Sequence, residues 1–510
     1  MRKILAFLLA ACLLVSAAPA LALNNDDAAL ADNWYEIFVY SFADGNGDRI
    51  GDFVGLKEKL PYLQSLHVDG VWLMPIHPSP SYHKYDVTDY CAIDPQYGTM
   101  EDFQAFLEAA HEAGIKVILD LVVNHTSSEH PWFQAARASA DSPYRAYYNF
   151  SDTPKTGYNA LPDGTYFESR FVSTMPDLNL DNPQVRAEIE EIMRFWLEMG
   201  VDGFRLDAVT SYYTGNKEKN ISFLRWLNGA AKAIRPDCFI VGECWDSLYT
   251  IHDYYASGVD SFFAFPVAQG SGYIAKILGN DVEKKGESLG NVINLLQREL
   301  GEYVMTPFLG NHDTPRIINS LGASSPTNAK MACGLLSILN GSIFVYYGDE
   351  IGLRYVEGLV SVEGGYNRTG SRSPMQWDST ANDGFSTADK SQLYIKQDDA
   401  PDRPTVEKQM LDDKSLYNEV KKLIKVRNDN PALHNLSAFE FVSSDGYPLV
   451  YKRSSDNQTV YVFINPSDKA VTVNADYAKG GKAIYTLGEN GSVGADTVTV
   501  PASGAIFVEV

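Results

Sequence analysis

Cysteine is scarce in this chain. Its 510 residues include five cysteines, and one of them, Cys12, lies in the apolar N-terminal stretch. The other four, Cys91, Cys238, Cys244 and Cys333, are too few for a disulfide framework and are not spaced like the ligands of a zinc site. We therefore expect free thiols in the core, or one disulfide at most.

Positive charge is also in short supply. The chain has 42 lysine and arginine residues against 65 aspartate and glutamate residues, which gives a net charge of −23. Nucleic acids and anionic membrane surfaces both require a basic face on the protein that binds them, so neither is an expected partner. An uncharged substrate is compatible with this balance, and the acidity itself favours solubility.

Long hydrophobic runs are missing beyond the N-terminus, so no membrane span is expected. At the N-terminus, a charged start, an apolar run over 4–15 and small residues after it predict a secretory signal peptide over 1–22. Cleavage is expected near Ala20 or Ala22, with export of the mature protein. The "LAAC" that ends at Cys12 leaves a lipidated N-terminus as the alternative.

Short apolar strands alternate with amphipathic helices between about 34 and 350. Eight such units predict an α/β fold in which a (β/α)₈ TIM barrel closes on itself, with an open doubly wound sheet as the alternative. The expected strands are "YEIFVY" (35–40), "GVWLMPI" (70–76), "KVILDLVV" (116–123), "GFRLDA", "FIVGE", "SFFAF", "VMTPFLG" and "SIFVYYG".

Two helices between these strands have clear ends. Thr99, with Asp102 three residues later, predicts a capped helix over 100–113. Pro183 predicts the start of another helix, and Gly200 its end.

The remaining segments predict two additions to the barrel. Residues 126–178 are too long for an ordinary loop and predict a small inserted domain after the third strand, so the barrel itself would span 33–125 and 179–425. Short alternating strands with Gly and Asn turns predict a C-terminal antiparallel β domain over 430–510.

Polar side chains gather at the carboxyl ends of the predicted strands, where barrel enzymes place catalytic groups. Each could alone be a hydrogen-bonded residue near a loop, but together they predict one site. They are Asp120, Asn124 and His125 after strand three, Arg205 and Asp207 on strand four, Glu243 after strand five, and Asn311, His312 and Asp313 after strand seven.

The chemistry of these polar residues is narrowed by the catalytic motifs that the sequence lacks. There is no serine nucleophile motif, Gly-rich phosphate loop or His-rich metal cluster. Carboxyl groups without such helpers suit acetal cleavage, in which one protonated carboxyl serves as the acid and an ionised one, ~5–5.5 Å away in a retaining enzyme, attacks the sugar. Arg205, two residues before Asp207, is expected to keep Asp207 ionised, and Glu243 has the less polar setting of a proton donor.

The motifs "DLVVNH", "GFRLDAV", "GECW" and "FLGNHD" resemble, in order, those of the α-amylase family of glycoside hydrolases. The resemblance extends from residue 33 to the C-terminus and implies a C-terminal β-sandwich. It implies Asp207 as nucleophile, Glu243 as general acid/base and Asp313 as transition-state stabiliser. It further implies that His125 and His312 bind the sugar, and that Arg205 supports the nucleophile.

Other matches to the family concern the substrate. "HKYDVTDY" implies Tyr85 as a stacking platform and Asp86 as a sugar ligand, and "SRSPMQWD" implies that Arg372 contacts the reacting sugar. The mixed motif "MPDLN" (175–179) resembles the intermediary subfamily between oligo-1,6-glucosidases and neopullulanases, which contains many secreted bacterial α-amylases. Ala208 resembles the α-1,4-acting pattern.

"DGNGDRIGD" (44–52) predicts a calcium site. It supplies oxygen atoms at alternate positions, a spacing that folds a loop around a hard cation; a metal-free Asp/Gly turn is the alternative. Many relatives in the family also carry a calcium loop here. The expected Ca²⁺ ligands are Asp44, Asn46, Asp48, Asp52 and the carbonyl group of Ile50. A second family site would pair Asn124 with a histidine, but Ser211 stands at that position, which puts the second site in doubt.

The sequence therefore predicts a secreted, monomeric retaining enzyme that cleaves α-1,4-glucosidic bonds in starch and maltooligosaccharides. An α-glucosidase or a 4-α-glucanotransferase would use the same catalytic residues and remains open. A non-catalytic glycan-binding barrel is disfavoured because all three carboxylates are present.

Overall fold

The computed structural model describes residues 32–279, 284–322, 325–359, 368–443 and 446–510. The predicted signal peptide, its cleavage site and Cys12 lie outside these residues. Among the described helices, none combines the length and the apolar character needed to cross a bilayer. Cys91, Cys238, Cys244 and Cys333 are all free thiols.

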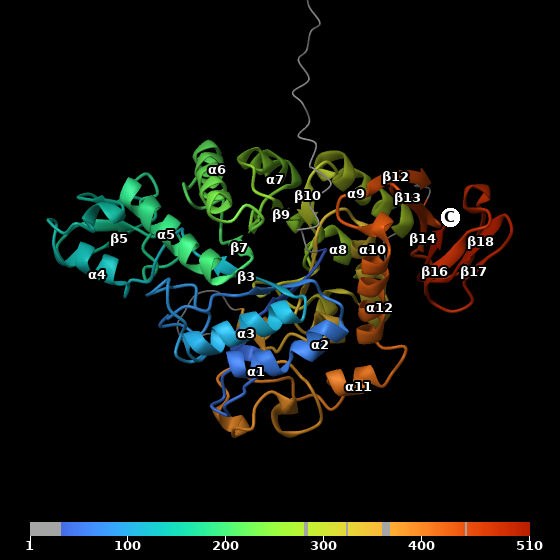
Figure 1. Ribbon diagram of the computed structural model, residues 1–510, viewed down its shortest axis with the longest axis horizontal. Coiled ribbons are helices and arrows are strands. Elements are labelled where there is room, and N and C mark those ends of the chain that lie inside the picture. Colours follow the sequence, from blue (N-terminus) through green and yellow to red (C-terminus); the bar gives the residue numbers. More distant parts are fainter. Residues whose placement is uncertain (1–31, 280–283, 323–324, 360–367, 444–445) are drawn as a thin grey trace, which may run out of the picture. The chain divides into compact units, whose positions relative to one another are not determined.

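Eight parallel strands form the central sheet, in the order β10-β9-β8-β7-β3-β2-β1-β11. Figure 1 labels β3, β7, β9 and β10 of this sheet. A parallel bridge between Phe308 and Phe344 brings the two ends of this order together, so the predicted barrel is confirmed and the open sheet is excluded. The strands are β1 Asn33–Ile37, β2 Gly70–Leu73, β3 Lys116–Leu121, β7 Gly203–Leu206, β8 Phe239–Gly242, β9 Ser261–Phe263, β10 Val304–Thr306 and β11 Ile343–Tyr346.

The first strand is shorter than the apolar run "YEIFVY" predicts. β1 ends at Ile37, and a 3₁₀ turn, Val39–Ser41, follows it. The reason is local hydrogen bonding: the N–H of Ser41 donates to the carbonyl of Phe38 at 3.0 Å, which turns the chain away from the sheet. An apolar run alone cannot distinguish a buried strand from a buried turn.

Helices alternate with these strands. Thr99 and Asp102 form the predicted capping box, and Gly200, with a left-handed φ of 114°, ends the helix that begins at Pro183. The helices are α1 Phe53–Glu58, α2 Leu60–Ser65, α3 Met100–Glu112, α5 Pro183–Met199, α6 Lys217–Ile234, α7 Leu248–Tyr254, α8 Tyr273–Gly279, α9 Lys285–Leu300, α10 Ser325–Ile338, α11 Val406–Met410 and α12 Leu416–Asp429.

The predicted inserted segment, 126–178, contains a short helix and a small antiparallel sheet with strand order β4-β6-β5. Asn124 at the end of β3 ties this segment to the barrel: its Nδ2 donates to Asp177 at 3.1 Å, and its carbonyl accepts from the N–H of Leu178 at 2.9 Å. The elements are α4 Pro131–Ala138, β4 Phe150–Ser151, β5 Tyr158–Ala160 and β6 Tyr166–Glu168.

The C-terminal strands form two antiparallel sheets, ordered β12-β13-β14-β19-β16 and β15-β18-β17 (red in Figure 1). Buried side chains from both sheets, among them Phe463, Val498 and Ile506, share one apolar cluster, as in a β-sandwich. The strands are β12 Ala438–Ser443, β13 Leu449–Ser455, β14 Gln458–Asn465, β15 Val471–Asn474, β16 Lys482–Leu487, β17 Ser492–Val493, β18 Thr497–Val500 and β19 Gly504–Glu509.

Candidate active site

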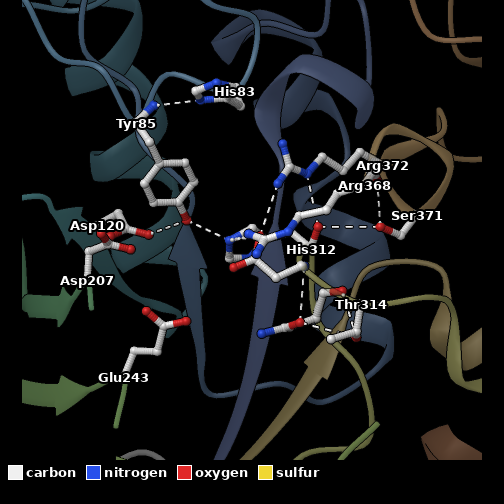
Figure 2. Close-up of polar contacts among 12 residues, drawn as sticks. His83, Tyr85, Asp120, Asp207, Glu243, His312, Thr314, Arg368, Ser371 and Arg372 are labelled. Atoms are coloured by element: carbon white, nitrogen blue, oxygen red, sulfur yellow. Dashed lines mark hydrogen bonds and ion pairs between the residues drawn. The ribbon is translucent and has the colours of Figure 1, made fainter. Parts of the chain in front are cut away.

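A cavity of about 410 Å³ is lined by residues that follow the carboxyl ends of the barrel strands. Figure 2 shows some of its polar lining residues together with polar residues that lie behind them. Five of the predicted site residues are buried and do not line the cavity: Asp120, Asn124, Arg205, Asn311 and His312. The predicted residues that do line the cavity are Tyr85, Asp86, His125, Asp207, Glu243, Asp313 and Arg372.

Arg205 is the centre of the charged network. It lies on β7, and its guanidinium Nη1 donates to Asp120 Oδ1 at 2.8 Å and to Asp207 Oδ1 at 2.7 Å. Its Nη2 lies 3.0 Å from Glu243 Oε2. One buried cation therefore holds three carboxyl groups from three neighbouring strands, where the sequence predicted a partner for Asp207 alone.

The turn after β7 positions the two predicted catalytic carboxyl groups. Ala208 has a left-handed φ of 47°, which is unfavourable for a residue with a side chain and typical of functional turns. In this conformation its N–H donates to Glu243 Oε2 at 2.8 Å. The backbone next to Asp207 thus fixes the orientation of Glu243.

The environment of Glu243 suits a proton donor. Burial raises the pKa of this carboxyl well above its usual range, and the positive charge of Arg205 only partly lowers it again. The negative charges of Asp207 and Asp313 raise the pKa of Glu243 further. A carboxyl with a raised pKa stays protonated near neutral pH and can give its proton to a leaving oxygen.

Asp313 has the opposite environment. Arg372 Nη2 lies 3.0 Å from its Oδ1, and Arg368 Nη1 lies 2.5 Å from the same oxygen. Burial alone would raise the pKa of Asp313, but His312 and these two arginines hold it below its usual range. Burial also lowers the pKa of His312 and keeps its imidazole neutral. The positive charge beside Asp313 therefore comes from the two arginines.

Arg368 was not predicted from the sequence. The motif "SRSPMQWD" begins three residues after it, so only Arg372 stood out. Arg372 is further held by its Nε, which donates to the carbonyl of His312 at 2.9 Å, and by its Nη1, which donates to Tyr82 Oη at 3.1 Å. Arg368 is the more exposed of the two, with 27% of its side chain accessible against 5% for Arg372.

Tyr85 connects the cavity wall to the residues behind it. Its ring stacks on His312 at a centroid distance of 5.4 Å, and its Oη lies 2.7 Å from His312 Nε2. The same hydroxyl donates to Asp120 Oδ2 at 3.0 Å (Figure 2). On the far side of the imidazole, Glu36 Oε1 lies 2.6 Å from Nδ1.

Glu36 was missed at the sequence level, although a signal existed. It is a charged residue inside the apolar strand "YEIFVY", as Arg205 is inside "GFRLDA". Asp120 was noticed but was given no role. Both residues lie on strands of the barrel, and both are buried.

Asp86 and His125 contribute to the cavity from the β2–α3 loop and the end of β3. Asp86 Oδ1 accepts a hydrogen bond from Ser79 Oγ at 2.6 Å, and burial raises its pKa. His125 Nε2 lies 3.2 Å from the carbonyl oxygen of Tyr85, and burial lowers its pKa, which favours the neutral imidazole. A neutral imidazole and a carboxyl group can both form hydrogen bonds with the hydroxyl groups of a sugar.

The predicted calcium loop forms a tight set of turns. Asp44 Oδ1 accepts from the N–H of Gly47 at 2.6 Å, and Asp48 Oδ1 accepts from the N–H of Ile50 at 3.0 Å. Asp52 is buried and caps α1 by accepting from the N–H of Gly55 at 2.7 Å.

The donor set of this loop is oxygen-only, as a hard cation prefers. Nevertheless, within the part of the chain that the structure describes, no three His, Cys, Asp or Glu side chains converge as metal ligands. Asn46 and Asp48 are exposed and Ile50 is half-buried, whereas Asp52 is buried and its Oδ2 already accepts from the N–H groups of Gly45 and Asn46 at 3.0 and 3.2 Å. A cation would therefore fit the exposed side, with Asp52 in a capping role.

The two residues at the doubtful second calcium site, Ser211 and Asn124, are hydrogen-bonded to other side chains. Ser211, which stands where a histidine would be needed, accepts a hydrogen bond from Arg170 Nε at 3.2 Å. The side chain of Asn124 donates a hydrogen bond to Asp177, as described above.

Comparisons with known proteins agree with one another. The family model described as alpha amylase, catalytic domain, matches residues 36–435. Alpha-amylase 3 of Dictyoglomus thermophilum is 40% identical over 440 residues, covering 85% of this chain and 84% of that protein. A probable alpha-glucosidase of Rhizobium meliloti is 30% identical over 541 residues, covering 93% and 95%. The solved structure of Eubacterium rectale Amy13B matches with a TM-score of 0.85 and 37% identity, covering 94% and 95%.

Proposed function

Because this chain belongs to the α-amylase family of glycoside hydrolases, we propose that it hydrolyses α-1,4-glucosidic bonds in starch and maltooligosaccharides with retention of configuration. The single observation that carries this proposal is the pair of carboxyl groups, Asp207 and Glu243, bound to the one guanidinium of Arg205 at the wall of the cavity.

In the proposed reaction, Glu243 protonates the glycosidic oxygen while Asp207 attacks the anomeric carbon. The C–O bond to the leaving sugar breaks and a covalent bond to Asp207 forms. Glu243, now ionised, then takes a proton from water as the water attacks the same carbon and releases Asp207. Arg205 holds Asp207 oriented through its 2.7 Å hydrogen bond.

Asp313 is proposed to stabilise the positive charge that develops on the sugar ring. The two arginines beside it favour the ionised carboxylate that this role requires. Tyr85, Asp86, His125 and Arg372 are proposed to bind the reacting sugar, while His312 supports them from behind the cavity wall.

The choice of α-1,4 bonds is supported by Ala208, which lines the cavity and resembles the α-1,4-acting pattern. Met175 also lines the cavity and begins the motif that resembles the intermediary subfamily, which contains many α-amylases. The name of the Dictyoglomus relative agrees with this choice. An α-glucosidase or a 4-α-glucanotransferase is the second candidate, because a relative with 30% identity is named a probable alpha-glucosidase.

We also propose that the protein is exported, acts as a monomer and binds Ca²⁺ at the 44–52 loop. Export rests on the signal-like sequence over 1–22, and calcium binding on the oxygen-only donor set of Asp44, Asn46, Asp48 and the Ile50 carbonyl group. A bound calcium ion would brace this loop, which precedes α1, and would take no part in bond cleavage.

The test is product analysis on soluble starch and on maltose, with the wild type beside Asp207→Asn. Mixed oligosaccharides from starch would support an α-amylase. Glucose alone would indicate an exo-acting glucosidase, and redistributed chain lengths a transferase. Asp207→Asn is expected to lose about four orders of magnitude in turnover or more, since the nucleophile is lost. Asp141→Asn, at an exposed loop position, is the matched control, and hydrolysis by Asp207→Asn at the wild-type rate would refute the assignment.

A further inference from the structure

Glu36 lies directly behind the candidate active site. It belongs to β1, is 2% exposed and is not among the residues that line the cavity. Its Oε1 lies 2.6 Å from Nδ1 of His312, and the backbone N–H of His312 donates to the same oxygen at 3.4 Å. Whatever Glu36 contributes to the reaction, it contributes through His312.

The other imidazole nitrogen of His312, Nε2, links Glu36 to further buried side chains. Nε2 of His312 lies 2.7 Å from the hydroxyl of Tyr85, which lies 3.0 Å from Asp120 Oδ2. Glu36, His312, Tyr85 and Asp120 therefore form a continuous line of three hydrogen bonds, which we call the buried chain. It ends at Arg205, which donates to Asp120.

A count of protons constrains the buried chain. Three hydrogen bonds need three hydrogen atoms. A neutral imidazole and a tyrosine hydroxyl supply two, and ionised Glu36 and Asp120 would supply none. The buried chain is therefore complete only if it holds one additional proton.

Asp313 indicates where this proton is needed. Its Oδ1 lies 3.4 Å from His312 Nε2, so a lone pair on Nε2 would face a carboxylate oxygen. A hydrogen on Nε2 removes this repulsion and also serves the hydrogen bond to Tyr85. With that hydrogen in place, the 2.6 Å contact between Nδ1 and Glu36 still needs one proton of its own.

The surroundings favour a neutral carboxyl beside a neutral imidazole. Burial raises the pKa of Glu36 well above its usual range and lowers the pKa of His312. Arg205 opposes this effect at Glu36, whereas Asp313 and Asp349 reinforce it.

From this geometry we propose that Glu36 is a positioning residue: it donates a proton to Nδ1 of His312 and so holds the imidazole with its Nε2–H toward Tyr85 and Asp313. Tyr85 is then free to donate to Asp120, and this bond fixes the carboxylate that accepts from Arg205. The inference rests on the proposed function, because its consequence is measured as glycoside hydrolysis.

Two substitutions separate this role from simple filling of space. Glu36→Met keeps a similar volume but leaves Nδ1 without a partner. We expect kcat to fall about 10- to 100-fold, as for a buried group left unsatisfied, with little change in KM. Glu36→Gln can still donate to Nδ1 through its amide, so it is expected to restore most of the loss.

Glu350 provides the matched control. It is also a buried glutamate, but its carboxyl accepts from Tyr35 and Tyr62 and has no contact with His312. Glu350→Gln is expected to leave kcat on maltooligosaccharides unchanged. If Glu36→Met matches the wild type, or if Glu36→Gln loses as much activity as Glu36→Met, the proposal is overturned.

A spectroscopic test covers the case in which Glu36→Met does not fold. In wild-type protein labelled with ¹⁵N-histidine, the ring shifts of His312, assigned by the signal missing from His312→Asn, should show a hydrogen on Nε2 at neutral pH. A bare Nε2 would overturn the proposal. An inactive wild type would instead contradict the proposed function, because the spectrum does not depend on turnover.

Discussion

Arg205 and Glu243 are buried and in direct contact, with Arg205 Nη2 3.0 Å from Glu243 Oε2. The same guanidinium donates to Asp207 Oδ1 at 2.7 Å, so the group that orients the proposed nucleophile also contacts the proposed proton donor. Burial raises the pKa of Glu243 and Arg205 lowers it, and burial is the larger effect. The protonation state of Glu243 is therefore the balance of two opposed influences, and it should be visible in the pH dependence of the enzyme.

The first prediction concerns that balance. Because the pKa of Glu243 is raised, the carboxyl is protonated at neutral pH and loses its proton as the pH rises through the raised pKa. We expect kcat/KM on maltooligosaccharides to fall on the alkaline side, measured as a pH profile of initial rates. Glu243→Gln should lose about 10²- to 10⁴-fold, as is usual for a general acid. It should regain much of this on a substrate whose leaving group needs no proton.

A flat alkaline limb in the wild type would contradict this assignment. The Glu350→Gln variant is the control, since Glu350 is equally buried but lies outside the cavity wall.

Much of this site follows from local sequence. Asp207 and Glu243 come directly after β7 and β8, and Asp313 lies in the loop that follows β10. Parallel strands bring their carboxyl ends to one face of a barrel. The pairing of Arg205 with Asp207 was accessible because side chains alternate along a strand. The eight-strand barrel could also be predicted, because its strands are short apolar runs that alternate with amphipathic helices.

Contacts between distant segments could not be predicted in this way. Arg368 and Asp313 are 55 positions apart, and Glu36 and His312 are 276 positions apart. No periodicity relates the members of such pairs. The extent of β1 also escaped prediction, because the turn after Ile37 is made of apolar residues that suit a strand equally well.

The second prediction concerns the two arginines at Asp313. Either substitution, Arg368→Met or Arg372→Met, should raise the pKa of Asp313, because a positive charge beside the carboxylate is lost. Asp313 must be ionised to act, so the acid limb of the pH profile of kcat/KM should move to higher pH. Both variants should show the shift, because Arg368 lies closer to the carboxylate oxygen while Arg372 is the more buried of the two. An unchanged acid limb in both variants would rule out their proposed influence on Asp313.

The third prediction concerns calcium. If the 44–52 loop binds Ca²⁺, the ion stabilises the folded state by mass action, and a chelator should lower the melting temperature. We expect added Ca²⁺ to restore it, measured by differential scanning calorimetry. In Asp48→Asn, which loses one of the exposed ligands, the melting temperature should respond less to chelator and to Ca²⁺. An identical response in wild type and variant would mean that any bound calcium lies elsewhere.

The last prediction concerns the stability of the network around Arg205. Arg205→Met leaves Asp120, Asp207 and Glu243 buried without their common cation, which should cost about 3–5 kcal/mol in the free energy of unfolding at neutral pH. Burial already raises the pKa values of Asp120 and Glu243, and loss of the cation that lowers them should raise both further. A carboxyl group whose pKa is higher in the folded state than in the unfolded chain favours folding at low pH and opposes it as the pH rises. Urea unfolding at pH 5 and pH 7.5 should therefore show a variant that is relatively more stable in acid.

Adding Asp120→Asn to Arg205→Met tests the cause directly. Asp120 is the most deeply buried of the three, and an amide in its place carries no charge while it can still accept a hydrogen bond from Tyr85. The double variant should recover part of the lost stability at pH 7.5 and little at pH 5, where the carboxyl is closer to neutral. Equal recovery at both pH values would show that packing around the guanidinium, rather than the unpaired charge, governs the loss.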